Sequence, residues 1–209
     1  MQQVLSNAFS VDEVKTSLFQ MGSTKMNALF YQKFWHVAGD MVINVVLDFL
    51  NFGYMVPKIN YTHIVLISKI KSPEIFFDFW PISLCNVIYK IISKVLTNRL
   101  KQILHHTISP TQSAFVLECL ITNNVLVAYE TLHTMHGKKK EKKGSLALKL
   151  DVSKPYDWVD WNFLLGIMVR LGFLEIWVDR VICCVTIASY SVLINGKPYG
   201  NITPSRGLR

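Results

Sequence analysis

The chain has 209 residues, of which 51% are hydrophobic and 17% charged. It is therefore long enough for one sizeable core and too apolar for a disordered tail. No uncharged apolar run reaches the roughly 18 residues of a membrane-spanning helix, and the N-terminus has no basic region followed by an apolar one. We expect an intracellular protein of the nucleus or cytoplasm that is not secreted and has no membrane partner.

The net charge of +8 lies in the middle of the chain. Residues 1–57 contain 3 basic residues (Lys and Arg) and 4 acidic ones (Asp and Glu). Residues 58–150 contain 13 basic and 5 acidic residues, and residues 151–209 contain 6 basic and 5 acidic residues. Such a basic block indicates a polyanionic partner, with nucleic acid as the first candidate. A solvated loop is the alternative, because the run "KKKEKKG" supplies five of these lysines: Lys138, Lys139, Lys140, Lys142 and Lys143.

The first third of the chain is predicted to be helical. Apolar and aromatic residues recur at helical spacing in residues 11–20 and 27–37. A further helix is predicted over residues 41–53, ending at Gly53. Residues 62–70, "THIVLISKI", are rich in β-branched side chains and predict a strand.

A long amphipathic helix is predicted to begin at Val87, because apolar residues recur at helical spacing as far as Leu104. Lys90, Lys94 and Lys101 share the opposite face, within about 40° of each other at 100° per residue. This lysine stripe is either a solvated helix face or a surface that contacts phosphates.

The remaining sequence predicts three helices, over residues 123–135, 161–171 and 175–187, with Gly172 capping the second. The pair Asn195-Gly196, flanked by alternating residues, is a strong hairpin signal. Strands scattered among helices, rather than alternating with them, predict the α+β fold class.

The stretch "LALKLDVSKPYDWVDW", residues 146–161, places one carboxylate at the end of an apolar run. Three leucines and a valine occupy every second position from Leu146 to Val152. This alternation predicts a half-buried strand with the apolar residues on one face and Asp151 on the other. The ordinary interpretation is that Asp151 is a solvent-facing aspartate at a strand end. The alternative, functional interpretation is that Asp151 is a metal ligand.

Four blocks carry a resemblance to a known family. They are "DFWPISLCNVIYKIISKVLTNRL", "ISPTQSAFV…LITNNVLVAYE", "LALKLDVSKPYD" and "SVLINGKPYGNITPSRGLR". In this order the chain resembles the reverse transcriptase of plant non-LTR (LINE-type) retroelements, from about residue 11 to residue 209. The resemblance implies the fingers and an incomplete palm of a right-hand polymerase fold. Residues 1–57 would be the N-terminal helical part of the fingers region, and residues 58–209 the reverse transcriptase domain with fingers and partial palm.

The resemblance also implies a site and partners. Asp151 matches the aspartate of the first palm motif, which binds both Mg²⁺ ions of a two-metal nucleotidyl transfer, and the carbonyl of Val152 would be a second ligand. Tyr156 occupies the position at which the family has an aromatic side chain. That side chain lies beneath the sugar of the nucleotide and excludes a 2′-hydroxyl group. The implied partners are an RNA template and a DNA primer, and the implied reaction is RNA-directed DNA synthesis.

The sequence departs from the family pattern at several positions. Trp80 stands where the family has an arginine near the triphosphate, and Pro155 stands where it has alanine. The family's Gln-Gly-Asp-Pro and Tyr-Ala-Asp-Asp motifs, which supply the remaining metal carboxylates, do not occur. We therefore expect no catalysis by this chain alone. Without the strands that carry those motifs, the strand ending at Asp151 would expose an apolar edge that invites self-association.

Two alternatives to a polymerase fragment remain open from the sequence. One is a non-catalytic basic nucleic-acid-binding or scaffold protein derived from a retroelement. The other is the product of a decayed gene with no function.

Overall fold

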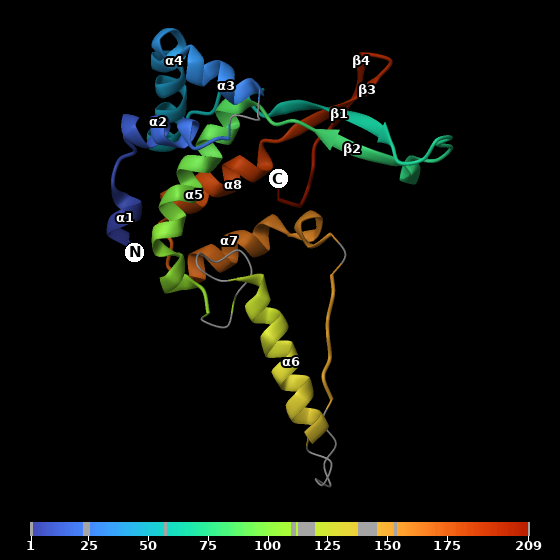
Figure 1. Ribbon diagram of the computed structural model, residues 1–209. Coiled ribbons are helices and arrows are strands. Elements are labelled where there is room, and N and C mark those ends of the chain that lie inside the picture. The colour runs from blue at the N-terminus through green and yellow to red at the C-terminus, as the bar shows by residue number, and fades with distance from the viewer. Residues whose placement is uncertain are drawn as a thin grey trace. The chain divides into compact units, whose positions relative to one another are not determined.

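The computed structural model describes residues 2–22, 26–56, 58–109, 112, 120–137, 146–152 and 154–208. The chain forms two compact units (Figure 1). The first unit combines Met1–Arg99 with Tyr156–Arg209, and the second is Leu100–Pro155. No helix within the described ranges is both long enough and apolar enough to cross a membrane.

The N-terminal part of the first unit is helical, with α1 (Gln2–Ser6), α2 (Val11–Phe19), α3 (Met26–Lys33) and α4 (Trp35–Leu47). A π-helical turn, η1 (Asp48–Phe52), continues α4 and ends at Gly53, whose φ of 86° confirms the predicted helix end. The helix predicted over residues 11–20 is confirmed as α2. The single helix predicted over residues 27–37 is wrong, because Phe34 has ψ 26° and separates α3 from α4.

A four-stranded sheet holds β2 (Phe79–Ser83), β1 (Tyr61–Ser68), β3 (Ser189–Ile194) and β4 (Lys197–Ile202), in that spatial order. β1 runs antiparallel to β2 and parallel to β3, and β3 pairs antiparallel with β4. The strand predicted over residues 62–70 is confirmed as β1. β2 was missed because Pro81 lacks an N–H donor, yet β2 is an edge strand, where a proline is tolerated.

The hairpin between β3 and β4 is confirmed. Asn195 has φ 50° and Gly196 has φ 75°, and positive φ at both central residues defines a type I′ turn. The twist of this turn matches that of the flanking strands, so its sequence sets the register in which Ile194 pairs with Lys197.

The other helices are α5 (Val87–Thr107), α6 (Ile121–Gly137), α7 (Trp161–Arg170) and α8 (Glu175–Thr186), with a short 3₁₀ turn, η3 (Pro155–Trp158). All four were predicted to within a few residues. Gly172, with φ 79°, donates its N–H to the carbonyl of Val169 and caps α7 as predicted. The second unit contains α6 and the end of α5.

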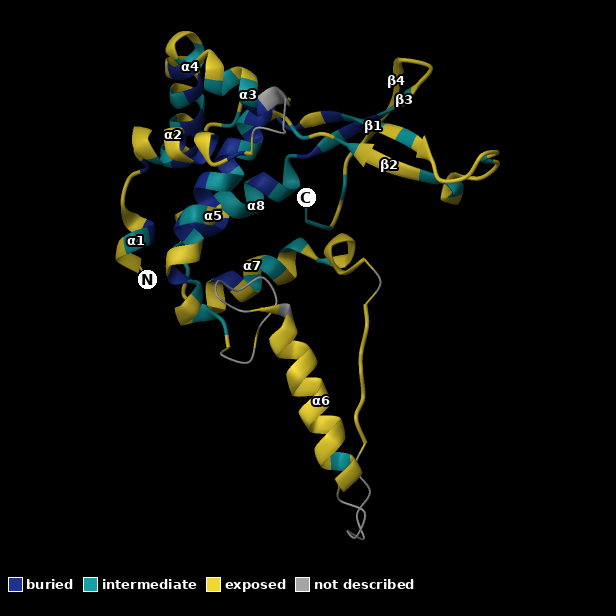
Figure 2. Ribbon diagram, in the orientation of Figure 1, coloured by how far each residue is buried: buried dark blue, intermediate teal, exposed yellow. Residues whose placement is uncertain are grey.

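The core of the first unit lies among α2, α4 with η1, α5 and α8 (Figure 2). Its fully or almost fully buried side chains include Val14, Leu18, Val46, Phe49, Ile91, Ile92, Val95 and Trp177. Tyr89 on α5 donates its hydroxyl hydrogen to the carbonyl of Cys184 on α8 at 2.9 Å, and burial raises the pKa of Tyr89, so this donor stays protonated. Burying an aliphatic or aromatic side chain of this size stabilises by about 1.5–3 kcal/mol.

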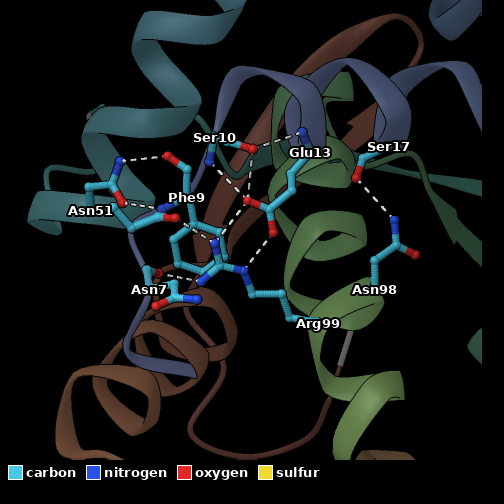
Figure 3. A network of polar contacts seen from close by, with 9 residues as sticks. Asn7, Phe9, Ser10, Glu13, Ser17, Asn51, Asn98 and Arg99 are labelled. Atoms are coloured by element: carbon cyan, nitrogen blue, oxygen red, sulfur yellow. Dashed lines mark hydrogen bonds and ion pairs between the residues drawn. The ribbon is translucent and has the colours of Figure 1, made fainter. Parts of the chain in front are cut away.

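A buried arginine joins α5 to the N-terminal segment (Figure 3). Arg99 is 5% exposed, and its Nε and Nη2 donate to the two carboxylate oxygens of Glu13 at 2.6 and 2.8 Å. The guanidinium also donates to the carbonyls of Asn7 and Ala8. Its Cζ lies 3.6 Å from the ring centroid of Phe9. Its charge is therefore paired and stacked inside the unit.

The carboxylate partner is itself held in place by the start of α2. Ser10 and Glu13 form a capping box in which Glu13 accepts the Ser10 N–H at 2.9 Å. Burial alone would raise the pKa of Glu13, but hydrogen bonds from Arg99 and Ser10 outweigh it and hold the pKa below its usual value. Glu13 is therefore ionised at neutral pH and matches the charge of Arg99.

Replacing Arg99 with methionine removes the charge and leaves Glu13 and two carbonyls without their donor. We expect Arg99→Met to lower the free energy of unfolding by about 3–5 kcal/mol, the usual range for breaking a buried ion pair. The matched control is Arg170→Met, at an exposed arginine on α7, with an expected change within about 0.5 kcal/mol. Urea denaturation followed by circular dichroism measures both, and equal losses would contradict the structural role of Arg99.

Candidate active-site region

The predicted strand over residues 146–152 is wrong. The segment is extended but belongs to none of the ladders formed by the described residues, and Figure 2 shows it exposed. Leu146, Leu148 and Leu150 are 89%, 75% and 81% exposed. The alternating pattern gives this segment strand propensity, but a strand also needs a hydrogen-bonded partner, and the ladders among the described residues include none of residues 146–152.

Asp151 and Val152 lie at the end of this segment, both with exposed side chains. The aspartate carboxylate and the valine carbonyl are hard oxygen donors, as Mg²⁺ requires. However, the described residues contain no cluster of three His, Cys, Asp or Glu side chains that could hold a metal ion. The donors among the described residues therefore do not fit a two-metal centre.

Tyr156 belongs to the first unit, on η3, with its side chain about half exposed. Its carbonyl accepts the N–H of Leu208 at 2.8 Å, and the neighbouring carbonyl of Val159 accepts the N–H of Gly207 at 2.8 Å. These two hydrogen bonds attach Gly207 and Leu208 to the turn from Tyr156 to Val159. The structure thus brings together two blocks that lie about 50 residues apart in the sequence.

Side chains reinforce this attachment. Trp161 at the start of α7 donates its Nε1 hydrogen to the carbonyl of Gly207 at 2.8 Å. The guanidinium of Arg206 lies 4.2 Å from the ring centroid of Trp158. Asp160 caps α7 by accepting the N–H of Phe163 at 3.0 Å, which fixes where the helix begins.

A cavity of about 290 Å³ adjoins the attached segment. Its lining includes Ile64, Asp157, Trp161, Tyr190, Arg206 and Leu208. Arg206 supplies a cation and Trp158 beside it an aromatic face, the two kinds of group that contact phosphates and bases of nucleic acids. A cation and an aromatic face thus lie next to this cavity, and among the described residues that line it Asp157 is the one acidic side chain.

The predicted lysine stripe on α5 is only partly exposed to solvent. Lys90 and Lys94 are half-buried and line a shallow hollow of about 380 Å³ with Tyr89 and neighbouring residues, whereas Lys101 is exposed. The loop lysines Lys138, Lys139, Lys140, Lys142 and Lys143 lie outside the described residues.

The sequence did not identify Lys69 as a cation near Trp80. Trp80 lies on β2, and the Nζ of Lys69 lies 4.4 Å from the centroid of its ring. Lys69 also donates to the carbonyl of Phe77 at 2.7 Å. A positive charge therefore lies beside Trp80, the position at which the family resemblance predicts an arginine. The sequence carried no signal for this contact, because β2 was not predicted and Lys69 lies just beyond the end of β1, in which Ile67 pairs with Trp80.

Gly207 gives a test of the attached segment. Its φ is 95°, and a Cβ there would lie 3.3 Å from the carbonyl oxygen of Asp157. The matched control is Gly200, whose φ of 68° is also positive but whose Cβ would meet open space. We expect Gly200→Ala to lower the free energy of unfolding by about 1–3 kcal/mol through backbone strain alone.

Gly207→Ala should show at least this much strain, because a φ of 95° lies outside the left-handed α region of L residues. In addition, it should show faster hydrogen exchange at the amides of residues 207 and 208. Native-state exchange measured by NMR on both variants distinguishes these effects. Unchanged protection of the two amides in Gly207→Ala would contradict the attachment.

Comparisons with known proteins agree with the sequence blocks. The family described as "Reverse transcriptase (RNA-dependent DNA polymerase)" matches residues 77–209. The "Transposon TX1 uncharacterized 149 kDa protein" of Xenopus laevis is 27% identical over 212 aligned residues. That alignment covers 98% of this chain and 16% of the Xenopus protein, so the chain spans about a sixth of the length of this relative. Since the family match includes more than half of the chain, the protein belongs to the reverse transcriptase (RNA-dependent DNA polymerase) family.

Proposed function

We propose that this chain is the fingers and part of the palm of a LINE-type, non-LTR reverse transcriptase. The observation that supports the proposal is the attachment of Gly207 and Leu208 to the turn around Tyr156, because both blocks belong to the family pattern and meet beside a cavity of about 290 Å³. Its substrates would be an RNA template, a DNA primer and deoxynucleotides. The proposed place of action is the nucleus or cytoplasm.

Three residues have proposed roles in nucleotide handling. Asp151 and the carbonyl of Val152 would be Mg²⁺ ligands, as oxygen donors at the position of the family's first palm motif. Tyr156 would lie beneath the sugar of the incoming nucleotide. The sequence has no Tyr-Ala-Asp-Asp motif to supply further carboxylates. We therefore propose that these 209 residues do not perform nucleotidyl transfer by themselves.

This proposal is tested by primer extension on an RNA template with Mg²⁺ or Mn²⁺. We expect no incorporation of deoxynucleotides by the full chain, because two-metal catalysis needs more than one protein carboxylate. An active reverse transcriptase on the same template is the positive control. Incorporation that disappears in Asp151→Ala would show that the chain has a complete active site.

A second candidate function is non-catalytic binding of nucleic acid. It is favoured by the positive charge of residues 58–150, which contain 13 basic and 5 acidic residues. In the described residues, Lys101 is exposed on α5 and Lys69 lies against Trp80. These groups can bind phosphates without reading a base sequence.

The expected result is weak, sequence-independent RNA binding that falls steeply with salt. Each phosphate neutralised on a single strand adds roughly −0.7 to the slope of log affinity against log salt. Neutralising the five loop lysines should reduce both affinity and slope in filter-binding or fluorescence-anisotropy titrations, whereas neutralising Lys15 and Lys33 on α2 and α3 should not. Effects in proportion to the five and two charges removed would show that only net charge matters.

We also propose self-association through the exposed segment of residues 146–152. Unpaired backbone groups beside exposed leucines favour intermolecular strand pairing. Changing all three leucines, Leu146, Leu148 and Leu150, to serine should shift the chain toward monomer in analytical ultracentrifugation. The matched control changes three exposed apolar residues on α7: Phe163, Leu165 and Val169. A monomeric parent chain, or an equal response to the two triple variants, would refute this contact.

A further inference from the structure

The hollow that Lys90 and Lys94 line on α5 concentrates positive charge. Its volume is about 380 Å³, and besides the two lysines its lining includes the apolar side chains of Met21 and Tyr89. Among the described residues that line it there is no aspartate or glutamate. A concave surface with charge of one sign raises the local concentration of ions of the opposite sign, so this hollow attracts anions.

The two lysines enter the hollow from one face of α5. Four residues of its lining follow one another at intervals of three and one positions, which places them on the same side of the helix: Lys90, Ser93, Lys94 and Thr97. The Ser93 and Thr97 hydroxyls donate to carbonyls one turn earlier, at 3.0 and 2.7 Å, so their hydrogens are already used. The two ammonium groups are therefore the donors that this face offers to an anion.

Neither lysine is neutralised by a neighbour. Lys90 and Lys94 have no ion pair or hydrogen bond within the part of the chain that the structure describes. α5 contains no acidic residue, and Glu13, which contacts α5, is bound to Arg99. Like charges four residues apart destabilise a helix, and both side chains are half-buried, where salt screens the repulsion less. An anion between the two ammonium groups would remove this repulsion.

The donors and the charge indicate the kind of anion. A lysine has a flexible stem, and no contact among the described residues holds either ammonium group elsewhere, so both can reach one ligand. Each ammonium has three donors and no acceptor. A phosphate monoester offers three acceptor oxygens and about −1.5 to −2 charges at neutral pH. A carboxylate has one charge and would leave one lysine uncompensated.

We propose that Lys90 and Lys94 form a binding site for a terminal phosphate group in the hollow on α5. Two sources offer such a group: a free phosphorylated compound and the phosphorylated end of a nucleic acid. Binding at this site needs no metal ion, no primer and none of the loop lysines, so it goes beyond both functions proposed above.

The experiment uses the full chain labelled with ¹⁵N, at neutral pH and constant ionic strength, without a divalent cation. Phenyl phosphate and phenyl sulfate are matched probes, because both combine a phenyl ring with three terminal oxygens but the sulfate has a single negative charge. Phenyl phosphate should shift the amide signals of Lys90, Ser93 and Lys94 in a saturable way. Phenyl sulfate should bind about three- to tenfold more weakly, because it lacks the charge that pairs with the second lysine.

Three variants locate the site. Lys90→Gln and Lys94→Gln should each weaken phenyl phosphate about three- to tenfold and remove its advantage over phenyl sulfate. The matched control is Lys15→Gln, at an exposed lysine on α2 that does not line the hollow, and it should leave both affinities unchanged. No saturable shift, equal affinities of the parent chain for the two probes, or the same loss in Lys15→Gln would overturn the proposal.

A stability measurement separates a binding role of the lysines from a structural one. Lys90→Glu places a carboxylate four residues before Lys94, an arrangement that stabilises helices. This variant should raise the thermal midpoint of the ligand-free chain by about 1–3 °C and abolish the response to phenyl phosphate. A lower midpoint in Lys90→Glu, Lys90→Gln and Lys94→Gln alike would show that the two lysines stabilise the fold, and would contradict an uncompensated pair.

The source of the phosphate is tested with a short single-stranded RNA that has either a 5′-phosphate or a 5′-hydroxyl. Displacement of phenyl phosphate by the phosphorylated RNA alone supports the site and assigns it to the end of a nucleic acid. Displacement by neither RNA supports it and assigns it to a free phosphorylated compound. Equal displacement by both would show that backbone phosphates occupy the hollow, which overturns the proposal of a terminal phosphate. Because the phenyl phosphate titration contains no RNA and no metal ion, its failure is distinct from a failure of the polymerase or RNA-binding proposals.

Discussion

The buried guanidinium of Arg99 ties three parts of the first unit together: α5, the segment before α2 and α2 itself. A charge removed from water costs several kcal/mol unless it is paired, so the chain must hold acceptors around this position on α5. Glu13 and the carbonyls of Asn7 and Ala8 provide them. The amide of Asn51 bonds both the N–H and the carbonyl of Phe9, so the same segment is tied to the end of η1 as well.

This arrangement shows that the folded unit extends upstream of the family match. The match begins at residue 77, yet Arg99 inside it pairs with Glu13 outside it. β1, also outside the match, is a central strand with β2 on one side and β3 on the other. The matched residues therefore form this sheet only together with residues that precede them, which agrees with a relative that aligns over 98% of the chain.

Local signals in the sequence predicted local structure well. Helical spacing located α5, α7 and α8, and the pair Asn195-Gly196 located the β3–β4 turn because its two positive φ angles suit few other residues. The family blocks identified the family. The cap at the start of α2 was readable too, since "SVDE" has the spacing of a capping box.

Long-range features could not be predicted in this way. Alternation over residues 146–152 reports strand propensity, but the presence of a pairing neighbour is decided elsewhere in the chain. In the sequence, Arg99 looks like any other cation of a basic stretch. Its buried pairing could not be predicted, because its partners are more than 80 residues away. Among the described residues the buried indole N–H of Trp177 on α8 has no acceptor, which depends on how α8 packs and which no local sequence pattern encodes.

The most direct test of this account is a double-mutant cycle between Arg99→Met and Glu13→Gln, measured as free energies of unfolding at several pH values. The pair should show a coupling energy of about 1–3 kcal/mol at neutral pH. Because the pKa of Glu13 is lowered from 4.5 in the folded state, the carboxylate contributes stability above pH 4.5. The coupling should therefore be lost as the pH falls through that lowered pKa. Additive effects at neutral pH, within about 0.5 kcal/mol, would contradict the account.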